Sequence, residues 1–323
     1  MTELPAVITV PGGAGSDWLR ANRDAVRSLV TRTGAVVVRG LPIVDDDSFV
    51  AACHAVTDAT VREREPFAPR EPRPGTGLAH SSASWPPDQP MCMHHEGSYG
   101  REVPGLMLFG CLVAPASGGA IALADGAAVL RDLPPALVDR FACEGWRLIR
   151  NHNGFIGVGW REAYGVPDPA ALADHCRAED IDLRWTPDGT VRTSRRRAAV
   201  VAHPETGEPV WFNQIAFLNE WTMEPAVREY LVAEFGPEGL PYTTTYGNGE
   251  PLDEVTVELI NDVYTAHTVR EPLRAGDLSI VDNVRTAHGR EPYTGDREVL
   301  VAFAEPLVPV PAVAIDSRGV SRR

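Results

Sequence analysis

Residues 275–300 decide how this chain is interpreted, and they read Ala-Gly-Asp-Leu-Ser-Ile-Val-Asp-Asn-Val-Arg-Thr-Ala-His-Gly-Arg-Glu-Pro-Tyr-Thr-Gly-Asp-Arg-Glu-Val-Leu. A Gly-Asp turn opens the stretch, an apolar run typical of a strand follows, and a polar link leads to His288. A turn containing Gly and Pro comes next, and a second strand opens with Arg297. The stretch therefore predicts two strands that are joined through a polar segment carrying a histidine.

Short strand-like segments of the same kind recur along the chain, at 35–40, 106–113, 121–123, 146–150, 198–202, 210–213, 278–281 and 299–303. Helical patterns fall between them, at 17–32, 44–58, 126–130, 135–141, 169–177, 225–234 and 252–268. Many short strands separated by turn residues favour an antiparallel jelly roll or barrel. No Gly-x-Gly-x-x-Gly follows a strand, which argues against a dinucleotide-binding sheet.

The composition excludes several kinds of chemistry. The 323 residues include no lysine, so all 30 basic residues are arginine. A Schiff base to a carbonyl group or a phosphate-binding P-loop needs a lysine, and neither can exist here. The net charge of −14 argues against nucleic acid as a partner. The one basic cluster, Arg195-Arg196-Arg197, is interpreted as the exposed start of a strand or loop.

The sequence also favours a cytoplasmic, soluble protein. The first residues, Met-Thr-Glu-Leu-Pro, have neither the basic nor the apolar region of a signal peptide. The apolar stretch 299–315 contains Glu305 and three prolines, so it is not expected to span a membrane. Five cysteines without Cys-x-x-Cys spacing argue against a disulfide framework or a structural zinc site.

Two His-x-Glu units offer a metal-binding pair. On an extended strand, residues i and i+2 point to the same side, so the histidine and the glutamate can hold one ion together. The unit at 203–205 lies in His-Pro-Glu-Thr-Gly and is interpreted as a solvent-exposed hairpin turn. The unit at 94–96 lies in Met-Cys-Met-His-His-Glu-Gly-Ser-Tyr, without a turn residue before it, and is the preferred site. A third ligand must come from elsewhere in the chain.

The arrangement resembles the Fe(II)/2-oxoglutarate-dependent dioxygenases of the TauD/TfdA superfamily. The resemblance covers most of the chain, and the blocks that carry it are 34–40, 94–99, 117–125, 211–214 and 276–290. It is closer to the branch that uses His-x-Glu, which includes clavaminate synthase, and nearest to the SyrP-like amino-acid hydroxylases. It implies a mixed α+β chain with a double-stranded β-helix (jelly roll) core and flanking helices. A single domain over 1–323 is expected, with a lid-like loop at about 60–90 and an insert at about 155–200.

The resemblance implies that His94, Glu96 and His288 bind Fe(II) as a facial triad. Two histidines and one carboxylate on one face of an octahedron leave three positions, which 2-oxoglutarate and dioxygen can fill. Arg297 stands where family members bind the distal carboxylate of 2-oxoglutarate, and Arg290 is the other candidate for this carboxylate or for substrate. A guanidinium suits a carboxylate because its planar fork makes two charge-assisted bonds. His95, in the opposite strand phase, is expected to pack or to support a ligand.

Candidate residues for the substrate pocket are Tyr99, Trp160, Trp211 and Asn213. For each aromatic residue, ordinary core packing is the stronger alternative. Asn213 is the best polar candidate because a buried amide needs a partner.

Two departures from the family pattern bear on cosubstrate binding. Many relatives place a threonine where this chain has Ile121, whose side chain cannot form a hydrogen bond. Many also carry a second arginine a few residues after the first, where residues 301–303 here are Val-Ala-Phe. The carboxylate ligand Glu96 is retained, which favours oxygen transfer over halogenation.

The expected reaction is hydroxylation of an aliphatic C–H bond, with release of succinate and CO2. The expected substrate is an amino acid or an amino-acid-derived intermediate of secondary metabolism, free or bound to a carrier protein. Desaturation and cyclisation would use the same residues. A metal-dependent hydrolase or isomerase on the same fold, for example one that uses zinc, and an inactive binding relative are the alternatives. The sequence leaves the substrate, the stereochemistry and the oligomeric state open.

Overall fold

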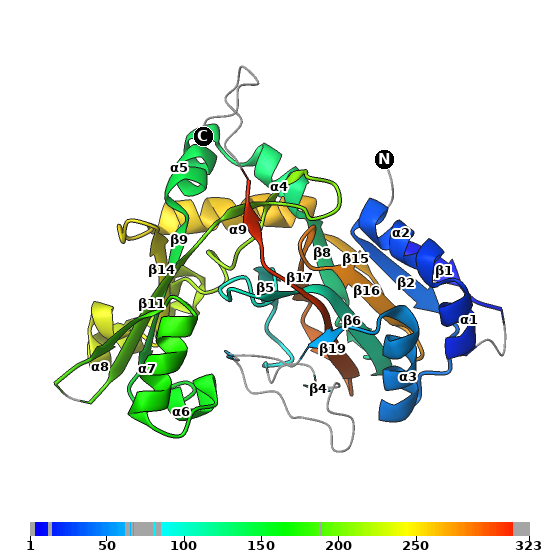
Figure 1. Ribbon diagram of the computed structural model, residues 1–323, viewed down its shortest axis with the longest axis horizontal. Helices are drawn as coiled ribbons and strands as arrows, with labels where there is room; N and C mark the ends of the chain where they lie inside the picture. The colour runs from blue at the N-terminus through cyan, green and yellow to red at the C-terminus, as the bar shows by residue number, and fades with distance from the viewer. Residues whose placement is uncertain are drawn as a thin grey trace.

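Two sheets form the centre of the computed structural model, which describes residues 4–11, 15–61, 65, 67, 80–81, 85–187 and 189–312 (Figure 1). The larger sheet has the order β1 (Ala6–Thr9), β2 (Ala35–Arg39), β16 (Leu278–Asp282), β6 (Val103–Val113), β19 (Glu298–Leu307) and β3 (Thr60–Val61), and β4 (His80–Ser81) also pairs with β19. The smaller sheet has the order β15 (Val269–Glu271), β8 (Ile121–Asp125), β17 (Thr286–Arg290) and β5 (Met91–His94). The pair β1–β2 is parallel, and the ladders that join β16, β6 and β19 and those of the smaller sheet are antiparallel.

The two sheets face each other across a shared apolar cluster. Met107 and Phe109 of β6 contribute to this cluster from the larger sheet, and Ile121 and Leu123 of β8 contribute from the smaller one. Side chains alternate along a strand, so Leu106 and Leu108 of β6 enter a different cluster on the other face of the larger sheet. The predicted mixed α+β chain with many antiparallel strands is confirmed, and two facing sheets are consistent with a jelly roll.

Three helices cover the outer face of the larger sheet: α1 (Ser16–Ala21), α2 (Arg23–Thr33) and α3 (Asp46–Val56) (Figure 1). The expected single helix over 17–32 is divided at Asn22, whose side chain donates to the carbonyl of Trp18 (2.8 Å). Helix α3 begins where the acidic run predicts, because the Asp45 carboxylate accepts from the backbone N–H of Ser48 in a capping box.

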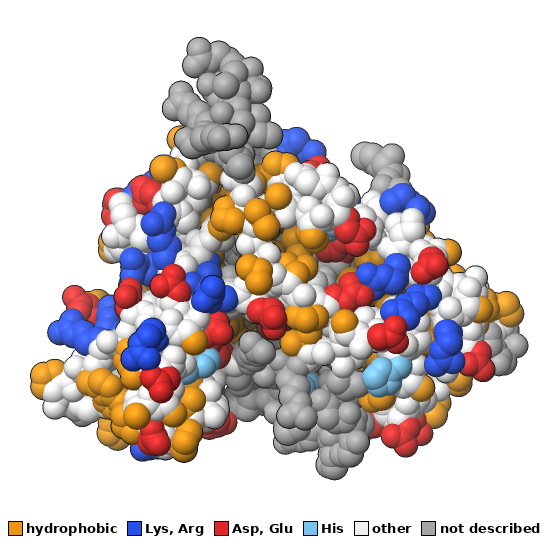
Figure 2. Space-filling model, viewed as in Figure 1, with side chains coloured by type: hydrophobic (Ala, Val, Ile, Leu, Met, Phe, Trp, Pro, Cys, Tyr) orange, Lys and Arg blue, Asp and Glu red, His pale blue; other side chains and the backbone are white. Residues whose placement is uncertain are grey.

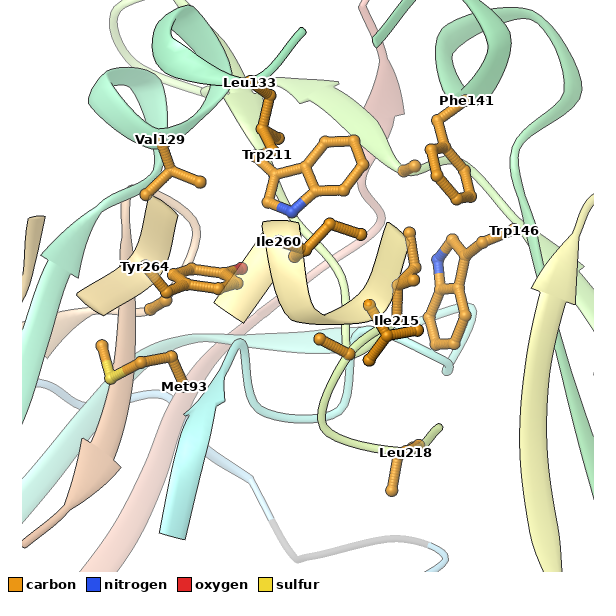
Figure 3. Close-up of a cluster of buried hydrophobic side chains, with 14 of the residues drawn as sticks. Met93, Val129, Leu133, Phe141, Trp146, Trp211, Ile215, Leu218, Ile260 and Tyr264 are labelled. Carbon is orange, nitrogen blue, oxygen red and sulfur yellow. The ribbon is translucent and has the colours of Figure 1, made fainter. Parts of the chain in front are cut away.

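A second apolar cluster lies outside the smaller sheet, beneath α4 (Gly126–Asp132), α5 (Pro135–Glu144) and α9 (Glu254–His267). Figure 3 shows Trp211 and Phe141 in this cluster, together with Ile260 and Tyr264 of α9 and Met93 of β5. This packing supports the outer face of β5, and β5 carries His94, the first of the predicted metal ligands.

The remaining elements form the other half of the molecule (Figure 1). One sheet has the order β10 (Asp182–Trp185), β11 (Val191–Arg197), β9 (Trp146–His152) and β14 (Tyr242–Tyr246). Helices α6 (Trp160–Tyr164), α7 (Pro169–Ala178) and α8 (Pro225–Phe235) and the short 3-10 helices η1 (Glu220–Thr222) and η2 (Pro237–Gly239) belong to this half. A small sheet of β13 (Pro209–Trp211), β12 (Val200–Ala202) and β20 (Val310–Pro311) and the pair β18 (Tyr293–Thr294) with β7 (Ser117–Gly118) complete the topology.

The expected insert at 155–200 contains α6, α7, β10 and β11, which lie outside the two facing sheets. Much of the expected lid at 60–90 lies outside the described residues. None of the helices in the described part of the chain is both long enough and apolar enough to cross a membrane.

Gly34 ends α2 and lets the chain pass close to β17. Its φ of 83° is left-handed, and an added Cβ would lie 2.3 Å from the hydroxyl oxygen of Thr286. That hydroxyl donates to the Gly34 carbonyl (3.0 Å), so this turn contacts the strand that carries His288.

We therefore expect Gly34→Ala to destabilise the protein more than Gly165→Ala. Both glycines end a helix with left-handed backbone, and alanine there costs about 1–2 kcal/mol. Nothing lies within 4 Å of an added Cβ at Gly165, so only the variant at Gly34 also displaces Thr286. Urea unfolding midpoints measure the difference, and equal losses would contradict the close approach.

Candidate metal centre and cosubstrate site

The three predicted metal ligands come together at one end of the smaller sheet. His288 of β17 lies directly opposite His94 of β5, so their side chains project from the same face, and their ring centroids are 4.4 Å apart. Glu96 follows His94 by two residues, and its Oε2 lies 4.0 Å from the Nε2 atom of each histidine. One ligand atom from each residue lies within 4.8 Å of the other two.

This donor set fits a divalent iron ion. Nδ1 of His94 lies 2.9 Å from the carbonyl of Cys92; donating a proton to that carbonyl leaves the Nε2 lone pair for a metal. Both histidines are nearly buried, and the Glu96 side chain is 12% exposed, so the site has a limited opening. Two imidazoles and one carboxylate on one face are the ligand set of the non-haem Fe(II) oxygenases.

Aromatic rings enclose the two histidines. Phe217 stacks on His94 with centroids 4.5 Å apart, and Trp85 lies 6.1 Å from Phe217. Phe109 of β6 meets His288 edge-on at 5.5 Å, from the opposite sheet. These apolar faces keep water away from the ligands and hold the imidazole rings in place.

Asn283 joins the segment before His288 to the segment that carries Glu96. Its side-chain oxygen accepts from the backbone N–H of Glu96 (2.8 Å), and its side-chain nitrogen donates to the carbonyls of Glu96 (3.0 Å) and Pro104 (2.7 Å). Its own carbonyl lies 2.7 Å from Nδ1 of His95. Asn283 is fully buried, so water cannot replace these bonds.

His95 lies on the opposite side from the ligands, as its strand phase predicts. Its ring packs on Phe212 with centroids 4.9 Å apart. Burial lowers the pKa of His95 to about 4, so the ring is neutral at neutral pH and can donate Nδ1–H to Asn283.

His203, interpreted from the sequence as part of a solvent-exposed turn, is buried, and that expectation is wrong for its side chain. The turn itself is present between β12 and β13, and the backbone N–H groups of Glu205 and Thr206 donate to Nδ1 of His203. Its Nε2 therefore carries the proton and donates to Asp282 (2.8 Å), the residue before Asn283. The other Asp282 oxygen accepts from the N–H groups of Val284 and Arg285, which shapes the link to His288.

Arg297 is the guanidinium best placed for an anionic cosubstrate. Its Nε donates to the carbonyl of Gly119 (3.1 Å), and its terminal nitrogens make no hydrogen bond or ion pair with any described residue. Burial, and then the nearby charge of Arg290, lower the pKa of Arg297 to about 10, so it remains charged at neutral pH. A half-buried cation without a carboxylate partner fits an anionic ligand.

The guanidinium of Arg290, unlike that of Arg297, has its terminal nitrogens bonded to backbone carbonyls. Its terminal nitrogens donate to the carbonyls of Trp85 (3.3 Å), Pro86 (2.6 Å) and Gln89 (2.9 Å). Its guanidinium also lies 4.9 Å from the ring centre of Tyr293. Arg290 therefore attaches residues 85–89 to β17, two positions from His288.

Tyr99 lines a cleft that includes the ligand Glu96. The cleft has a volume of about 610 Å³, part of it open solvent, and its other walls include Val61, Phe303 and His175. The Tyr99 hydroxyl donates to the backbone carbonyl of Glu65 (2.9 Å).

The Glu65 carboxylate anchors one wall of this cleft. It accepts from Arg195 (2.5 Å) and lies 3.0 Å from Nε2 of His175. Burial by itself would raise the pKa of Glu65, but the charge of Arg195 and the hydrogen bonds from His175 and Arg195 outweigh it and hold the pKa at about 2. Arg195 is 2% exposed, so the expectation of an exposed basic cluster is wrong for this residue.

The other three candidate substrate residues pack in apolar clusters or bond to the backbone. Trp211 is buried in the cluster of Figure 3, where it meets Phe141 edge-on. Trp160 packs beside α7 and meets Trp185 edge-on at 5.8 Å. Asn213 donates to the carbonyl of Ala199 and accepts from the N–H of Ile215, and its own carbonyl accepts from the N–H of His95. The structure shows no contact of these three side chains with the triad, and their substrate roles remain predictions.

Asn283→Ala is expected to lower the metal affinity, whereas a variant of another buried asparagine that loses a similar amount of folding stability should keep it. The change leaves the N–H of Glu96 and the carbonyl of Pro104 without their partner, at about 1–3 kcal/mol for each buried group. Asn219→Ala is the matched control, because this asparagine is equally buried and bonds to Thr244 and Trp221. Cobalt(II) titration and thermal unfolding of both variants compare affinity with stability. Equal metal affinity in the two variants would show that Asn283 does not position Glu96.

Comparison with known proteins shows the family of this chain. The family described as "Taurine catabolism dioxygenase TauD, TfdA family" matches residues 2–303. The Dapdiamide synthesis protein DdaC of Enterobacter agglomerans is 30% identical over 286 residues, which is 88% of this chain and 86% of that protein. A clavaminate synthase-like protein of Arabidopsis thaliana is 25% identical over 326 residues, covering 94% of each chain.

Solved structures of low sequence identity share the fold. A taurine dioxygenase from Burkholderia xenovorans has a TM-score of 0.53 at 18% identity, covering 98% of this chain and 90% of that one. PvcB, described as an Fe, alpha-ketoglutarate dependent oxygenase from an isonitrile synthetic pathway, has a TM-score of 0.50 at 14% identity, covering 93% of this chain and 85% of that one. With the triad, the family match identifies the class that the sequence predicts: the chain belongs to the TauD/TfdA family of Fe(II)- and 2-oxoglutarate-dependent dioxygenases.

Proposed function

We propose that this enzyme hydroxylates an aliphatic C–H bond of an amino acid or of an amino-acid-derived natural-product intermediate, and that it converts 2-oxoglutarate into succinate and CO2. The observation that carries the proposal is the convergence of His94, Glu96 and His288, with the carboxylate ligand retained. The proposal places this chemistry in one domain with a double-stranded β-helix core and a cytoplasmic location.

Each part of the site has a separate task. Bound iron, with 2-oxoglutarate and dioxygen, supplies the oxidising power that inserts one oxygen atom into the substrate. His94, His288 and Glu96 would hold the metal. Phe217 and Phe109 cover the imidazole rings, which limits the access of water to the reacting atoms.

Arg297 is proposed to bind the distal carboxylate of 2-oxoglutarate through its two terminal nitrogens. The neighbouring wall is apolar at Ile121, which is buried between the two sheets and replaces the threonine of many relatives. The cosubstrate therefore depends on Arg297 more than it would with a hydroxyl at this position. Arg290 already donates to three backbone carbonyls, so a direct role at the carboxylate is the weaker proposal.

The substrate class is proposed from the relatives. DdaC is named for dapdiamide synthesis, and PvcB for an isonitrile synthetic pathway. Both names belong to natural-product pathways, which supports an amino-acid-derived substrate, free or presented by a carrier protein. Tyr99 and the cleft beside Glu96 are the proposed substrate contacts.

Anaerobic addition of Fe(II) and 2-oxoglutarate is expected to produce a visible metal-to-ligand charge-transfer band. His94→Ala should abolish the band because one of three ligands is lost. Arg297→Gln should keep the band. The 2-oxoglutarate concentration that gives half of its full intensity should rise by about tenfold to a hundredfold, because one charge-assisted pair is lost. Arg131→Gln, an exposed change on α4, is the control. A band that is unchanged by His94→Ala would overturn the assigned triad.

A succinate-release screen over amino acids and carrier-bound aminoacyl groups separates the alternatives. Succinate formed only with a substrate and oxygen supports an active oxygenase, and mass spectrometry distinguishes a gain of one oxygen from loss of two hydrogens. Turnover without oxygen and 2-oxoglutarate would instead indicate a zinc-type hydrolase or isomerase. Iron binding with no succinate from any of these compounds would indicate a binding relative.

A further inference from the structure

The second His-x-Glu unit, at 203–205, lies outside the proposed metal centre, but its histidine contacts the link between β16 and β17. We propose that His203 is a positioning residue, which acts through Asp282 to fix this link and thereby the positions of Glu96 and His288. The inference rests on the proposed metal-binding role of the triad. His203 acts from a distance, because the cleft that it lines contains none of the three ligands.

The turn between β12 and β13 fixes the orientation of the His203 ring. Its Nδ1 accepts from the backbone N–H groups of Glu205 (3.3 Å) and Thr206 (3.2 Å). The backbone N–H of His203 donates to the carbonyl of Glu208 (2.9 Å), which closes the turn. Because Nδ1 is an acceptor, the ring proton lies on Nε2, and Nε2 is directed at Asp282.

The Asp282 carboxylate carries this constraint into the link. Its Oδ2 accepts from Nε2 of His203 (2.8 Å), and its Oδ1 accepts from the backbone N–H groups of Val284 (3.1 Å) and Arg285 (3.0 Å). A carboxylate that is bonded at both oxygens has one orientation. The two N–H groups of the link therefore have defined positions, and the chain enters β17 in one conformation.

The strands that flank the turn pack against the same link. Val201 of β12 and Phe212, which follows β13, share an apolar cluster with Val284. The hydrogen bond from His203 and this packing therefore hold the link from the same side of the chain.

Two of the predicted ligands depend on the link. Asn283, the residue after Asp282, bonds the backbone N–H and carbonyl of Glu96. The strand that follows the link begins at Thr286 and carries His288. A displaced link would therefore move a carboxylate ligand and a histidine ligand together.

The bond between His203 and Asp282 is buried, which makes its loss costly. The two side chains are 2% and 9% exposed. Figure 2 shows acidic and basic side chains spread over the surface of the molecule, where pairs of such groups contribute little because water competes for them. A buried carboxylate oxygen that loses its donor is not fully compensated by water. Without His203, the Asp282 side chain is expected to turn toward another donor and to release the N–H groups of the link.

Cobalt(II) titration, together with amide hydrogen exchange of the metal-free protein, tests this role with two variants. His203→Asn keeps an oxygen in the place of Nδ1 and can still cap the turn, but it does not reach Asp282. His203→Gln puts an amide N–H group in the place of Nε2. His203→Asn should lower the cobalt affinity by about tenfold and speed exchange at residues 282–288. His203→Gln should keep both close to the wild-type values.

Gly207→Ala is the matched control for loss of stability in the same turn. Gly207 is exposed, its φ is 71°, and an added Cβ would have no neighbour within 4 Å. The change should lower the unfolding temperature but leave cobalt affinity and exchange at 282–288 unchanged. Asp282→Asn tests the link from its other side and remains informative if His203→Asn does not fold. In either orientation its amide nitrogen faces an N–H donor, so cobalt affinity should fall.

His94→Ala separates this inference from the proposed function. It should lower cobalt affinity more than any of these variants, because a ligand is lost. Unchanged cobalt binding in His94→Ala would overturn the triad itself. If His94→Ala weakens binding and His203→Asn does not, only the positioning role is overturned. Equal losses in His203→Asn and His203→Gln, or in His203→Asn and Gly207→Ala, would overturn that role as well.

Discussion

The amide side chain of Asn283 is the constraint on which the metal centre depends. It accepts a hydrogen bond from the backbone N–H of Glu96 and donates one to the backbone carbonyl of Glu96, across a sequence separation of 187 residues. Strand pairing alone places His94 opposite His288, but Glu96 lies beyond the end of β5 and has no ladder to hold it. Because Asn283 is buried, its bonds are not exchanged with water, and the Glu96 backbone has one defined position.

Neighbouring contacts support the same link between β16 and β17. Asp282 accepts from the two N–H groups that follow Asn283 and is itself bonded by His203 from the β12–β13 turn. Thr286 is bonded to the end of α2 through Gly34. Arg290 holds residues 85–89, whose Trp85 contacts Phe217 and through it the His94 ring. Side chains from distant parts of the chain therefore position the ligand atoms, which agrees with the dependence of metal sites on their outer contacts.

The predictions that succeeded rest on local patterns. Short strand-like runs at 106–113 and 278–281 predict strands, and β6 and β16 confirm them. The His-x-Glu spacing predicts that the side chains of residues 94 and 96 come together, and they do, although Glu96 lies beyond the end of β5. The predictions that failed concern burial and partners. His203 sits in a turn-like sequence of Pro and Gly, yet its ring is buried, and Asp282, 79 residues away, accepts a hydrogen bond from it. Arg195 belongs to a run of three arginines, yet it is buried because Glu65 neutralises it. No local pattern reveals such pairs, because each depends on which distant segments meet.

The sequence by itself predicted the class of fold and, through its resemblance to a known family, the three candidate metal ligands. It also determined that the side chains of all 30 basic residues are guanidinium groups, since the chain has no lysine. The absence of lysine and the His94–Glu96 pair follow from residue type and short-range spacing, whereas His288 follows from the resemblance to the family. The tertiary structure decided which arginines remain available for anions. Arg195 is paired and Arg290 is occupied by backbone carbonyls, whereas Arg297 keeps terminal nitrogens without a hydrogen-bond partner among the described residues. The physical reason is that the interaction of a charge depends on the groups that lie within a few ångströms of it. Those distances are set by the packing of distant segments and cannot be derived from the sequence.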